Sequence, residues 1–394
     1  MATDKECKEA RVRAALSNKE GDRVPVSDFF WTGFMLKAKE QWGQDLDIYR
    51  KFDLDYVVVN PNMDPVIQDF EILEDDGVNI KLRTGFGAII RRSGTAPMPH
   101  FDSFSVAEPD EMENYVLESG RDRRRLYRTG DDQINGVGDA IGRNTPSWID
   151  RVDSYCRDIP VFGSICEGYE YLWRCIGTEN SLIWMMTEPE MFGSFVKRIG
   201  DFLVELTEYQ IEESKGKLMG MYIWGDVAYV NGMLFSPACW REFFKPITER
   251  IIAVCKKAGL VTIYHGCGNA TPIYNDLIAI GLEGYNPVEC KARLDVVELK
   301  KDFGGKLCFV GNYDVRELES GDRDRIKKHA LYKLQSALGG GWICQSDHSV
   351  SSSVSPDSYA YMVEIIREYG KYPLDMDRIR KELALLEDTK VKKV

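Results

Sequence analysis

A histidine and a cysteine two residues apart form the part of this sequence best suited to chemistry. His265 and Cys267 follow the apolar run 259–263, which reads as a β-strand. Side chains alternate between the two faces of a strand, so both should project from the strand end in the same direction. Neutral imidazole and thiolate are good zinc ligands. The spacing predicts half of a zinc site, although a buried cysteine beside a hydrogen-bonded histidine would look the same in an ordinary core.

Other polar residues stand where further apolar runs end. Asp226 and Glu289 each occupy such a position, and we expect both to be catalytic residues. Either carboxylate could orient His265, bind a metal or protonate a leaving group. A salt bridge or a helix cap at the same place is the alternative role. Glu167 and Glu170, after another run, are comparable candidates.

Aromatic residues also gather near the predicted strand ends. Many large aromatic residues at one opening suit a flat apolar ligand, or a quaternary amine held by cation–π contact. Core packing is the alternative role of such residues. We expect four of these aromatic residues and one polar strand-end residue to bind substrate. They are Phe30, Trp31, Tyr169, Trp224 and Asn312.

The elements that must position these residues alternate from about residue 155 onward. Short apolar runs predict strands over 161–166, 219–226, 261–267, 284–289, 307–312 and 341–347. Longer amphipathic stretches between them predict helices over 188–213, 236–258, 271–280, 295–302, 322–338 and 356–369. One strand per unit favours a parallel sheet of the α/β class.

A closed (β/α)₈ TIM barrel is the preferred fold. No strand is followed by a glycine-rich nucleotide-binding motif, which an open doubly wound sheet would often carry. The polar residues collect at the carboxyl ends of strands, where barrel enzymes place their active sites.

We expect one barrel domain over 1–394, because no low-complexity linker divides the chain. Residues 1–150 form an N-terminal extension with the first strands. That segment includes a helix over 4–17, a turn over 21–25, a strand over 56–60 and a β-rich excursion across the rim over 65–100. Residues 151–375 form the main barrel, and 376–394 form a C-terminal helix and tail.

Composition narrows the class of protein and its location. The 394 residues are 44% hydrophobic and 29% charged, as in ordinary globular proteins. The net charge of −12 argues against nucleic acid or anionic lipid as a partner. No apolar run is long enough to span a membrane, and the first residues lack a signal peptide. Ten cysteines without a CxxC pair suit a reducing compartment, so we expect a cytoplasmic protein.

Five short motifs together resemble a known family. They are His265–Asn269, Gly284–Glu289, Gly311–Asn312, Gly339–Gly341 and Asp347–Ser349. In this order they are similar to the uroporphyrinogen decarboxylase superfamily, and the similarity is strong over 155–370. That superfamily contains the decarboxylases of haem synthesis and zinc-dependent methyltransferases that work with corrinoid proteins. The resemblance implies a (β/α)₈ barrel.

The segment after Pro25 separates these two activities. Decarboxylases of the family carry an arginine-rich R-Q-A-G-R motif there, which holds the carboxylates of a porphyrinogen. Here Ser27–Phe34 contains no arginine and is aromatic and acidic instead. A substrate with many carboxylates needs cationic partners. The methyltransferase branch is therefore favoured, with a cofactor-free decarboxylase as the alternative.

The methyltransferase resemblance implies a set of metal ligands and partners. His265 and Cys267 match the first two zinc ligands of that branch, and His348 stands where the third is expected. Cys344 and Cys290 are alternative third ligands. The implied reaction moves a methyl group from a small methylated substrate, best an aryl methyl ether, to the cobalt of a separate corrinoid protein. Transfer from a corrinoid protein to a thiol remains an alternative, and the oligomeric state stays open, with a homodimer as one case.

Overall fold

A curved parallel sheet forms the centre of the molecule. The computed structural model describes residues 3–67, 71–93, 99–127, 133–134, 140–141 and 146–391. Seven neighbouring parallel strands make up the sheet, in the order β1 (Val57–Val58), β8 (Val161–Cys166), β9 (Leu218–Trp224), β12 (Val261–His265), β13 (Gly284–Asn286), β14 (Cys308–Val310) and β15 (Trp342–Ile343). Three strands begin at the predicted residue, namely β8, β12 and β13. Three begin one residue later than predicted, namely β1, β14 and β15, and β9 begins one residue earlier.

The segment around Val26 joins the two edges of this sheet. Val26 forms a parallel bridge with Cys344 beside β15, and the Ser27 amide donates to the Cys344 carbonyl. On its other side, the Val26 carbonyl accepts from the amide of Asp55, just before β1. The residues predicted as a turn over 21–25 thus lead directly into an eighth strand position. The sheet closes as a (β/α)₈ barrel.

The inside of the barrel is filled by alternate residues of the strands. Phe162, Tyr222 and Ile263 point inward and form one apolar cluster. Val12 and Leu16 of α1 (Asp4–Leu16) belong to the same cluster. Helix α1 therefore closes the amino-terminal end of the barrel, which leaves the carboxyl ends of the strands as its open mouth.

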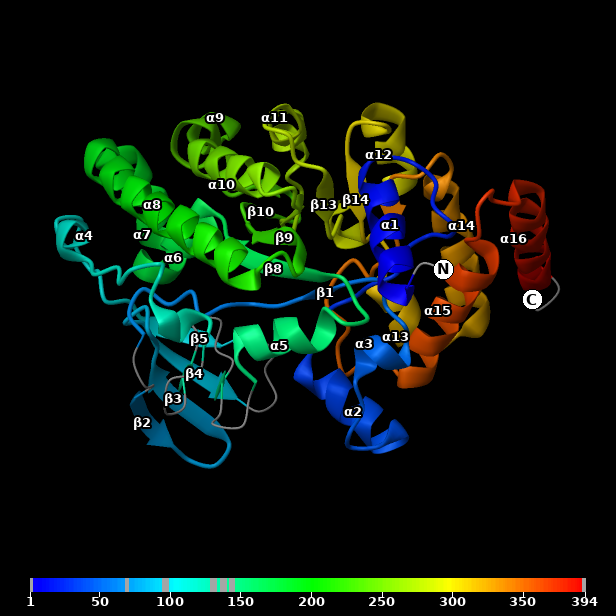
Figure 1. Ribbon diagram of the computed structural model, residues 1–394, viewed down its shortest axis with the longest axis horizontal. Coiled ribbons are helices and arrows are strands. Elements are labelled where there is room, and N and C mark those ends of the chain that lie inside the picture. Colours follow the sequence, from blue (N-terminus) through cyan, green and yellow to red (C-terminus); the bar gives the residue numbers. More distant parts are fainter. Residues whose placement is uncertain are drawn as a thin grey trace.

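Helices cover the outside of the barrel and bury its larger core. Figure 1 shows α8 and α10 beside β8 and β9, with α14, α15 and α16 at the opposite end of the sheet. The helices after α1 are α2 (Thr32–Trp42), α3 (Ile48–Lys51), α4 (Glu111–Asn114), α5 (Trp148–Tyr155), α6 (Gly168–Ile176), α7 (Thr178–Thr187), α8 (Pro189–Ser214), α9 (Pro237–Cys239), α10 (Lys245–Lys257), α11 (Tyr274–Ala279), α12 (Val296–Phe303), α13 (Val315–Glu319), α14 (Arg323–Leu334), α15 (Pro356–Tyr369) and α16 (Met376–Val391). A π-helical turn, Trp240–Phe244, joins α9 to α10, and residues 392–394 of the predicted tail lie outside the described residues.

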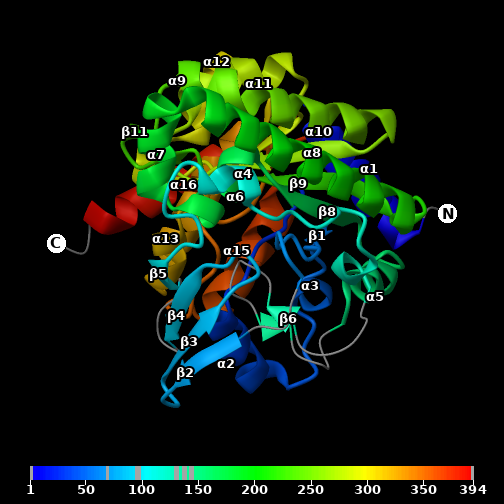
Figure 2. The same cartoon turned by 90° about the vertical axis from the view of Figure 1, so that its left-hand side faces the viewer.

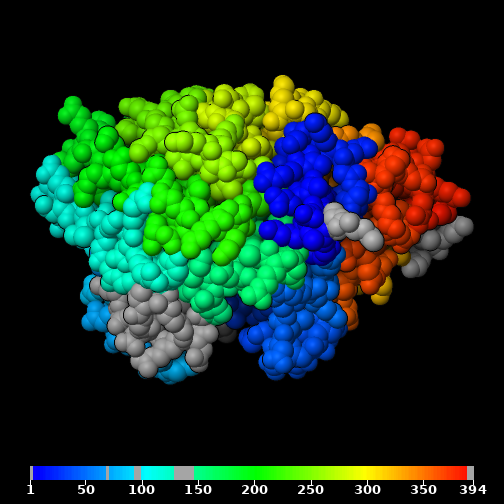
Figure 3. Space-filling view, viewed as in Figure 1, coloured from blue at the N-terminus to red at the C-terminus, as the bar shows by residue number. Residues whose placement is uncertain are grey.

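The predicted β-rich excursion is a second, antiparallel sheet. Its four strands are β2 (Glu71–Asp75), β3 (Asn79–Arg83), β4 (Ile89–Ser93) and β5 (His100–Ser103). Phe101 of β5 packs against Trp173 of α6, the helix that follows β8, so the sheet sits at the rim of the mouth. Two views place this sheet and α2 on the same side of the barrel (Figure 1, Figure 2). The residues around α2 stand out from the molecular surface in Figure 3.

Two small hairpins complete the described strands. They are β6 (Gln133–Ile134) with β7 (Ala140–Ile141), and β10 (Ala228–Tyr229) with β11 (Gly232–Met233). None of the helices that the structure describes has both the length and the hydropathy of a membrane span.

Candidate metal centre

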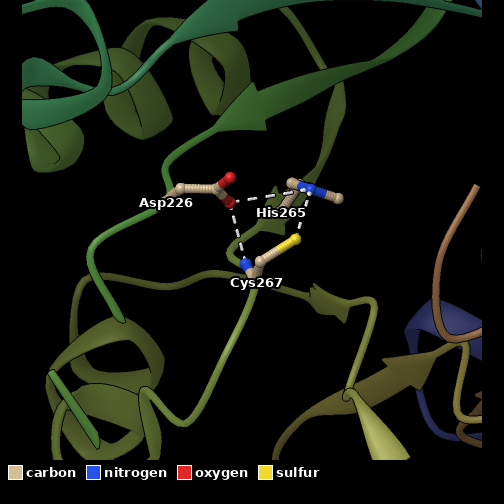
Figure 4. A group of neighbouring side chains, drawn as sticks. All are labelled: Asp226, His265 and Cys267. Carbon is tan, nitrogen blue, oxygen red and sulfur yellow. Dashed lines mark hydrogen bonds and ion pairs between the residues drawn. The ribbon is translucent and has the colours of Figure 1, made fainter. Parts of the chain in front are cut away.

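Asp226, His265 and Cys267 converge at the mouth of the barrel. Cys267 Sγ lies 3.5 Å from His265 Nε2, and Asp226 Oδ1 lies 3.7 Å from the same nitrogen. The three donor atoms all fall within 4.8 Å of one another, and Figure 4 shows them facing a common point. The predicted same-face arrangement of His265 and Cys267 is present, and the neighbouring strand adds the carboxylate. The Asp226 side chain is 45% exposed and that of His265 17%, so the group is open to solvent on one side.

Asn286 determines which nitrogen of His265 faces this group. His265 Nδ1 lies 2.6 Å from Asn286 Oδ1, while Asn286 Nδ2 donates to the Val310 carbonyl at 2.9 Å. Because the amide nitrogen is used on Val310, the amide oxygen must accept from His265 Nδ1–H. The lone pair of His265 then lies on Nε2 and points at Cys267 and Asp226. A histidine held in this way is ready to bind a metal.

The loop after β12 is shaped by two carboxylates and by glycine. Asp226 Oδ1 accepts from the Cys267 amide at 2.8 Å, and Glu289 Oε2 accepts from the Gly268 amide at 2.8 Å. Gly268 has φ +76°, and a Cβ there would lie 2.5 Å from the Tyr229 carbonyl oxygen. Glycine is therefore required at this position. The loop holds Cys267 against His265 in a fixed direction.

Burial and nearby carboxylates raise the pKa of the Cys267 thiol well above its ordinary value. Burial is the larger cause, followed by the charges of Asp226 and Glu289. An anionic thiolate beside these carboxylates needs a compensating cation. Sulfur, imidazole nitrogen and carboxylate oxygen are together a donor set that zinc accepts, with a fourth position left for a small ligand. The residues present fit a zinc ion.

An aromatic wall stands next to the donor group. The ring of Trp224 lies 5.0 Å from that of His265, between centroids, and 5.3 Å from that of Phe29. Tyr222 precedes Trp224 by two residues on β9, so it lies on the same face and deeper in the barrel. Its ring contacts those of both Trp224 and Phe29. Trp224 and Phe29 are half-buried, so part of each ring faces the mouth. Trp224 is one of the residues predicted to bind substrate, and its ring lies beside the donor group.

Acidic residues of α6 lie behind the wall, away from solvent. Glu167 caps α6, its Oε2 accepting from the Tyr169 amide at 2.6 Å. Burial raises the pKa of Glu167 to about 8. Glu170 is also buried and pairs with Arg174 and with Trp173 Nε1. Both carboxylates are buried, and burial together with the charge of nearby Asp226 contributes to raising the pKa of Glu170.

Three of the residues predicted to bind substrate contact other side chains or a loop of the protein. Phe30 packs between α2 and α15, with its ring 5.1 Å from Tyr359. Tyr169 is buried, 4.6 Å from the ring of Phe235. The amide of buried Asn312 donates to the Val288 carbonyl at 2.6 Å, which fixes the loop carrying Glu289. The strand alternation explains Phe30: its neighbour Phe29 takes the inward position.

The predicted third metal ligands lie outside the donor group. The His348 ring packs edge-on against Trp31, 5.0 Å between centroids, and its Nδ1 is 3.3 Å from the Ser349 carbonyl. Cys344 is buried with its sulfur 3.7 Å from that of Met362. Cys290 Sγ lies 3.6 Å from the Asn312 carbonyl oxygen. Among the residues that the structure describes, Asp226 is the third donor beside His265 and Cys267.

Two residues of the site were not singled out from the sequence. Asn286 lies directly beside His265 in the parallel register of β12 and β13. Its signal was the strand 284–286, where alternation from Gly284 places position 286 on the inner face. Phe29 lies within the aromatic segment Ser27–Phe34, but nothing in that segment distinguishes it from Phe30. The register between strands is what brings these side chains to the donor group.

Comparison with known proteins identifies the family. The chain matches the sequence model of the family described as uroporphyrinogen decarboxylase (URO-D) over residues 149–369, more than half of its length. The chain belongs to the URO-D family. Uroporphyrinogen decarboxylases of Bacillus cereus (strain B4264) and Bacillus anthracis are each 27% identical to it over 198 residues, 49% of this chain and 52% of theirs. The chain thus spans about half the length of the curated relatives it matches.

A solved structure shares the fold over nearly its whole length. This URO-D family member superposes on a methyltransferase from Methanosarcina mazei with a TM-score of 0.63 and 18% sequence identity, covering 92% of this chain and 98% of the other. The predicted barrel and the predicted superfamily are confirmed. The segment before residue 149, outside the family match, is part of the shared fold.

Proposed function

We propose that this URO-D family member is a zinc-dependent methyltransferase. It would move a methyl group from a small methylated substrate, best an aryl methyl ether, to the cobalt of a separate corrinoid protein. The convergence of Asp226, His265 and Cys267 on one point at the barrel mouth is the observation that supports this most. A decarboxylase without a cofactor has no need for a thiol and an imidazole lone pair aimed at the same place.

The residues of the chain would each have a defined part. His265 Nε2, Cys267 Sγ and Asp226 would hold the zinc ion, and Asn286 would keep the His265 lone pair directed at it. Bound zinc acts as a Lewis acid that shares the charge of the heteroatom losing its methyl group. Glu289 would hold the Gly268 amide, and with it the loop that carries Cys267.

The wall of the mouth suits an uncharged aromatic substrate. The inward side chains nearest the carboxyl ends of the strands are Phe29, Asn60, Ser164, Trp224, His265, Asn286 and Gln345. None of these seven is a lysine or arginine, and Asp226 adds negative charge beside them. A flat arene would pack on Trp224 and Phe29 with its ether oxygen near the donor group. Phenolate is a better leaving group than an alkoxide, so aryl ethers should react faster than alkyl ethers.

Decarboxylation is the second candidate, because the curated relatives that the chain matches are uroporphyrinogen decarboxylases. A substrate with many carboxylates would meet Asp226 and Glu289 at the mouth. The nearby Arg174 is buried and paired with Glu170. Like charges at close range disfavour such a substrate. Methyl transfer in the opposite direction, from a corrinoid protein to a thiol, would use the same donor group.

A methyl-transfer assay separates these activities. The zinc-loaded protein is mixed with cob(I)alamin and a panel of methoxyarenes, methylamines and methyl thioethers, and methyl-cobalt is followed by absorbance. We expect turnover of methoxyarenes, its loss in Cys267→Ala, and its retention in Cys239→Ala, a half-buried cysteine of α9 outside the group. Turnover only of amines or thioethers would overturn the ether assignment. Carbon dioxide release from uroporphyrinogen by Cys267→Ala would overturn the methyltransferase.

A further inference from the structure

Asn60 is an exposed polar residue of the mouth to which no role has been given. It follows β1, and alternation from the inward Val58 places it on the inner face of the barrel. Its amide lies against Ser164 of β8 and Trp224 of β9. Asn60 is thus the polar neighbour of the aromatic wall, and two strands, β8 and β9, lie between β1 and the His265 strand β12.

The orientation of the Asn60 amide is fixed by its neighbours. Trp224 Nε1 lies 3.3 Å from Asn60 Oδ1, and an indole N–H can only donate. Ser164 Oγ donates to the same oxygen at 2.6 Å. Oδ1 therefore accepts two hydrogen bonds. If the amide were rotated by 180°, its Nδ2–H would face the Trp224 Nε1–H, and two donors would oppose each other. The Nδ2 group forms no hydrogen bond with any residue that the structure describes.

The free Nδ2 group and the donor group flank the same indole. Trp224 contacts His265 with its ring and Asn60 with its Nε1. A planar molecule lying on Trp224 with one end at His265 and Cys267 would therefore bring its other end toward Asn60. The two unused N–H bonds of Asn60 Nδ2 favour a molecule that carries a hydrogen-bond acceptor at that end.

We propose that Asn60 Nδ2 donates a hydrogen bond to a second oxygen of the methyl donor, on the side of the arene away from the ether being cleaved. This assignment rests on the proposed function and narrows its substrate class to methoxyarenes that carry another acceptor oxygen. Asn60 is a specificity residue and takes no part in the chemistry. One neutral hydrogen bond favours the acceptor-bearing donor by about three- to tenfold in affinity.

Two probes of the same shape test this assignment. 4-Methoxyacetophenone carries a carbonyl oxygen that only accepts, and in 4-methoxy-α-methylstyrene a CH₂ group replaces that oxygen. Binding of each to the zinc-loaded protein is measured by calorimetry for wild type, Asn60→Asp and the control Asn114→Asp. Asn114 is an exposed asparagine at the end of α4, remote from the mouth. Aspartate at position 60 can still accept from Ser164 and Trp224 but has no N–H to donate.

We expect wild type and Asn114→Asp to prefer the ketone about three- to tenfold, and Asn60→Asp to lose or invert that preference with its zinc content unchanged. Equal binding of the two probes by wild type, or an unchanged preference in Asn60→Asp, would overturn the assignment. Methyl-cobalt formation from either probe is recorded separately. If none forms while the binding preference behaves as expected, the methyltransferase proposal fails and the Asn60 contact stands.

Discussion

Asn286 fixes the direction in which His265 Nε2 points, and the proposed zinc site depends on that direction. Without its Oδ1 acceptor, the His265 ring could rotate or exchange its tautomer, and Nε2 would lose its fixed direction. We expect Asn286→Ala to weaken zinc binding by about 10- to 100-fold. Competition with a chromophoric chelator measures the change. Asn269→Ala is the matched control, because Asn269 lies in the same loop but its Oδ1 accepts from Thr271. Equal zinc affinity in all three proteins would contradict this role.

The burial of Glu167 predicts the direction in which the free energy of unfolding changes with pH. Burial raises its pKa from 4.5 to about 8 in the folded state. Between these two values the folded protein keeps a proton that the unfolded chain has lost. The contribution of Glu167 to the free energy of unfolding therefore falls as pH rises through this range.

We expect Glu167→Gln to be more stable than wild type above about pH 8, by about 2 to 4 kcal/mol, and equally stable below about pH 4.5. Glutamine can still cap α6 through its oxygen, while Oε1 of Glu167 has no partner among the described residues. Urea unfolding at several pH values measures the difference. A parallel shift at every pH would mean that the effect is packing and not ionisation.

At the scale of single elements, α1 is the plug of the barrel. Leu16 reaches the inner cluster and contacts β13 next to Gly284. We expect Leu16→Ala to lower the free energy of unfolding by about 2 to 5 kcal/mol, because it leaves a cavity in a closed barrel. Bound zinc per chain should stay the same, since the mouth lies at the other end. Loss of zinc at a temperature where the variant is folded would contradict this separation.

Elements with strong periodicity were predictable, and those defined by partners were not. β8 and α15 agree with their predicted bounds because apolar runs and the Ser355–Pro356 start mark them directly. The strand position at Val26 has too few residues for a pattern and exists only because Cys344 and Asp55 lie on either side.

The same distinction applies to the candidate metal centre. His265 and Cys267 share one strand end, so their spacing predicts their meeting. The carboxylate of Asp226 follows another strand. The sequence indicates Asp226 as a candidate but does not distinguish whether it orients His265, binds a metal or donates a proton. His348 was inferred from resemblance, and its place against Trp31 depends on the path of the loop after β15. Contacts between elements require the register of the barrel, which no single segment encodes.

At the scale of the molecule, we propose that the whole chain is one folding unit. The family match begins at residue 149, but the barrel needs the segment around Val26 and β1 to close. A fragment of residues 149–394 would expose the edges of β8 and β15. We expect it to show no cooperative thermal unfolding by near-ultraviolet circular dichroism, unlike the full chain. A fragment that unfolds cooperatively would show that the first 148 residues are a separate unit.

The composition of the metal site can be measured directly. X-ray absorption at the zinc edge of the purified protein counts the sulfur, nitrogen and oxygen neighbours of the metal. With Asp226, His265 and Cys267 as ligands, we expect one zinc per chain with a single sulfur at about 2.3 Å and the remaining neighbours nitrogen or oxygen at about 2.0 to 2.2 Å. The sulfur should vanish in Cys267→Ala and persist in Cys239→Ala. Two sulfur neighbours, or a protein that does not retain zinc after reconstitution, would contradict this site.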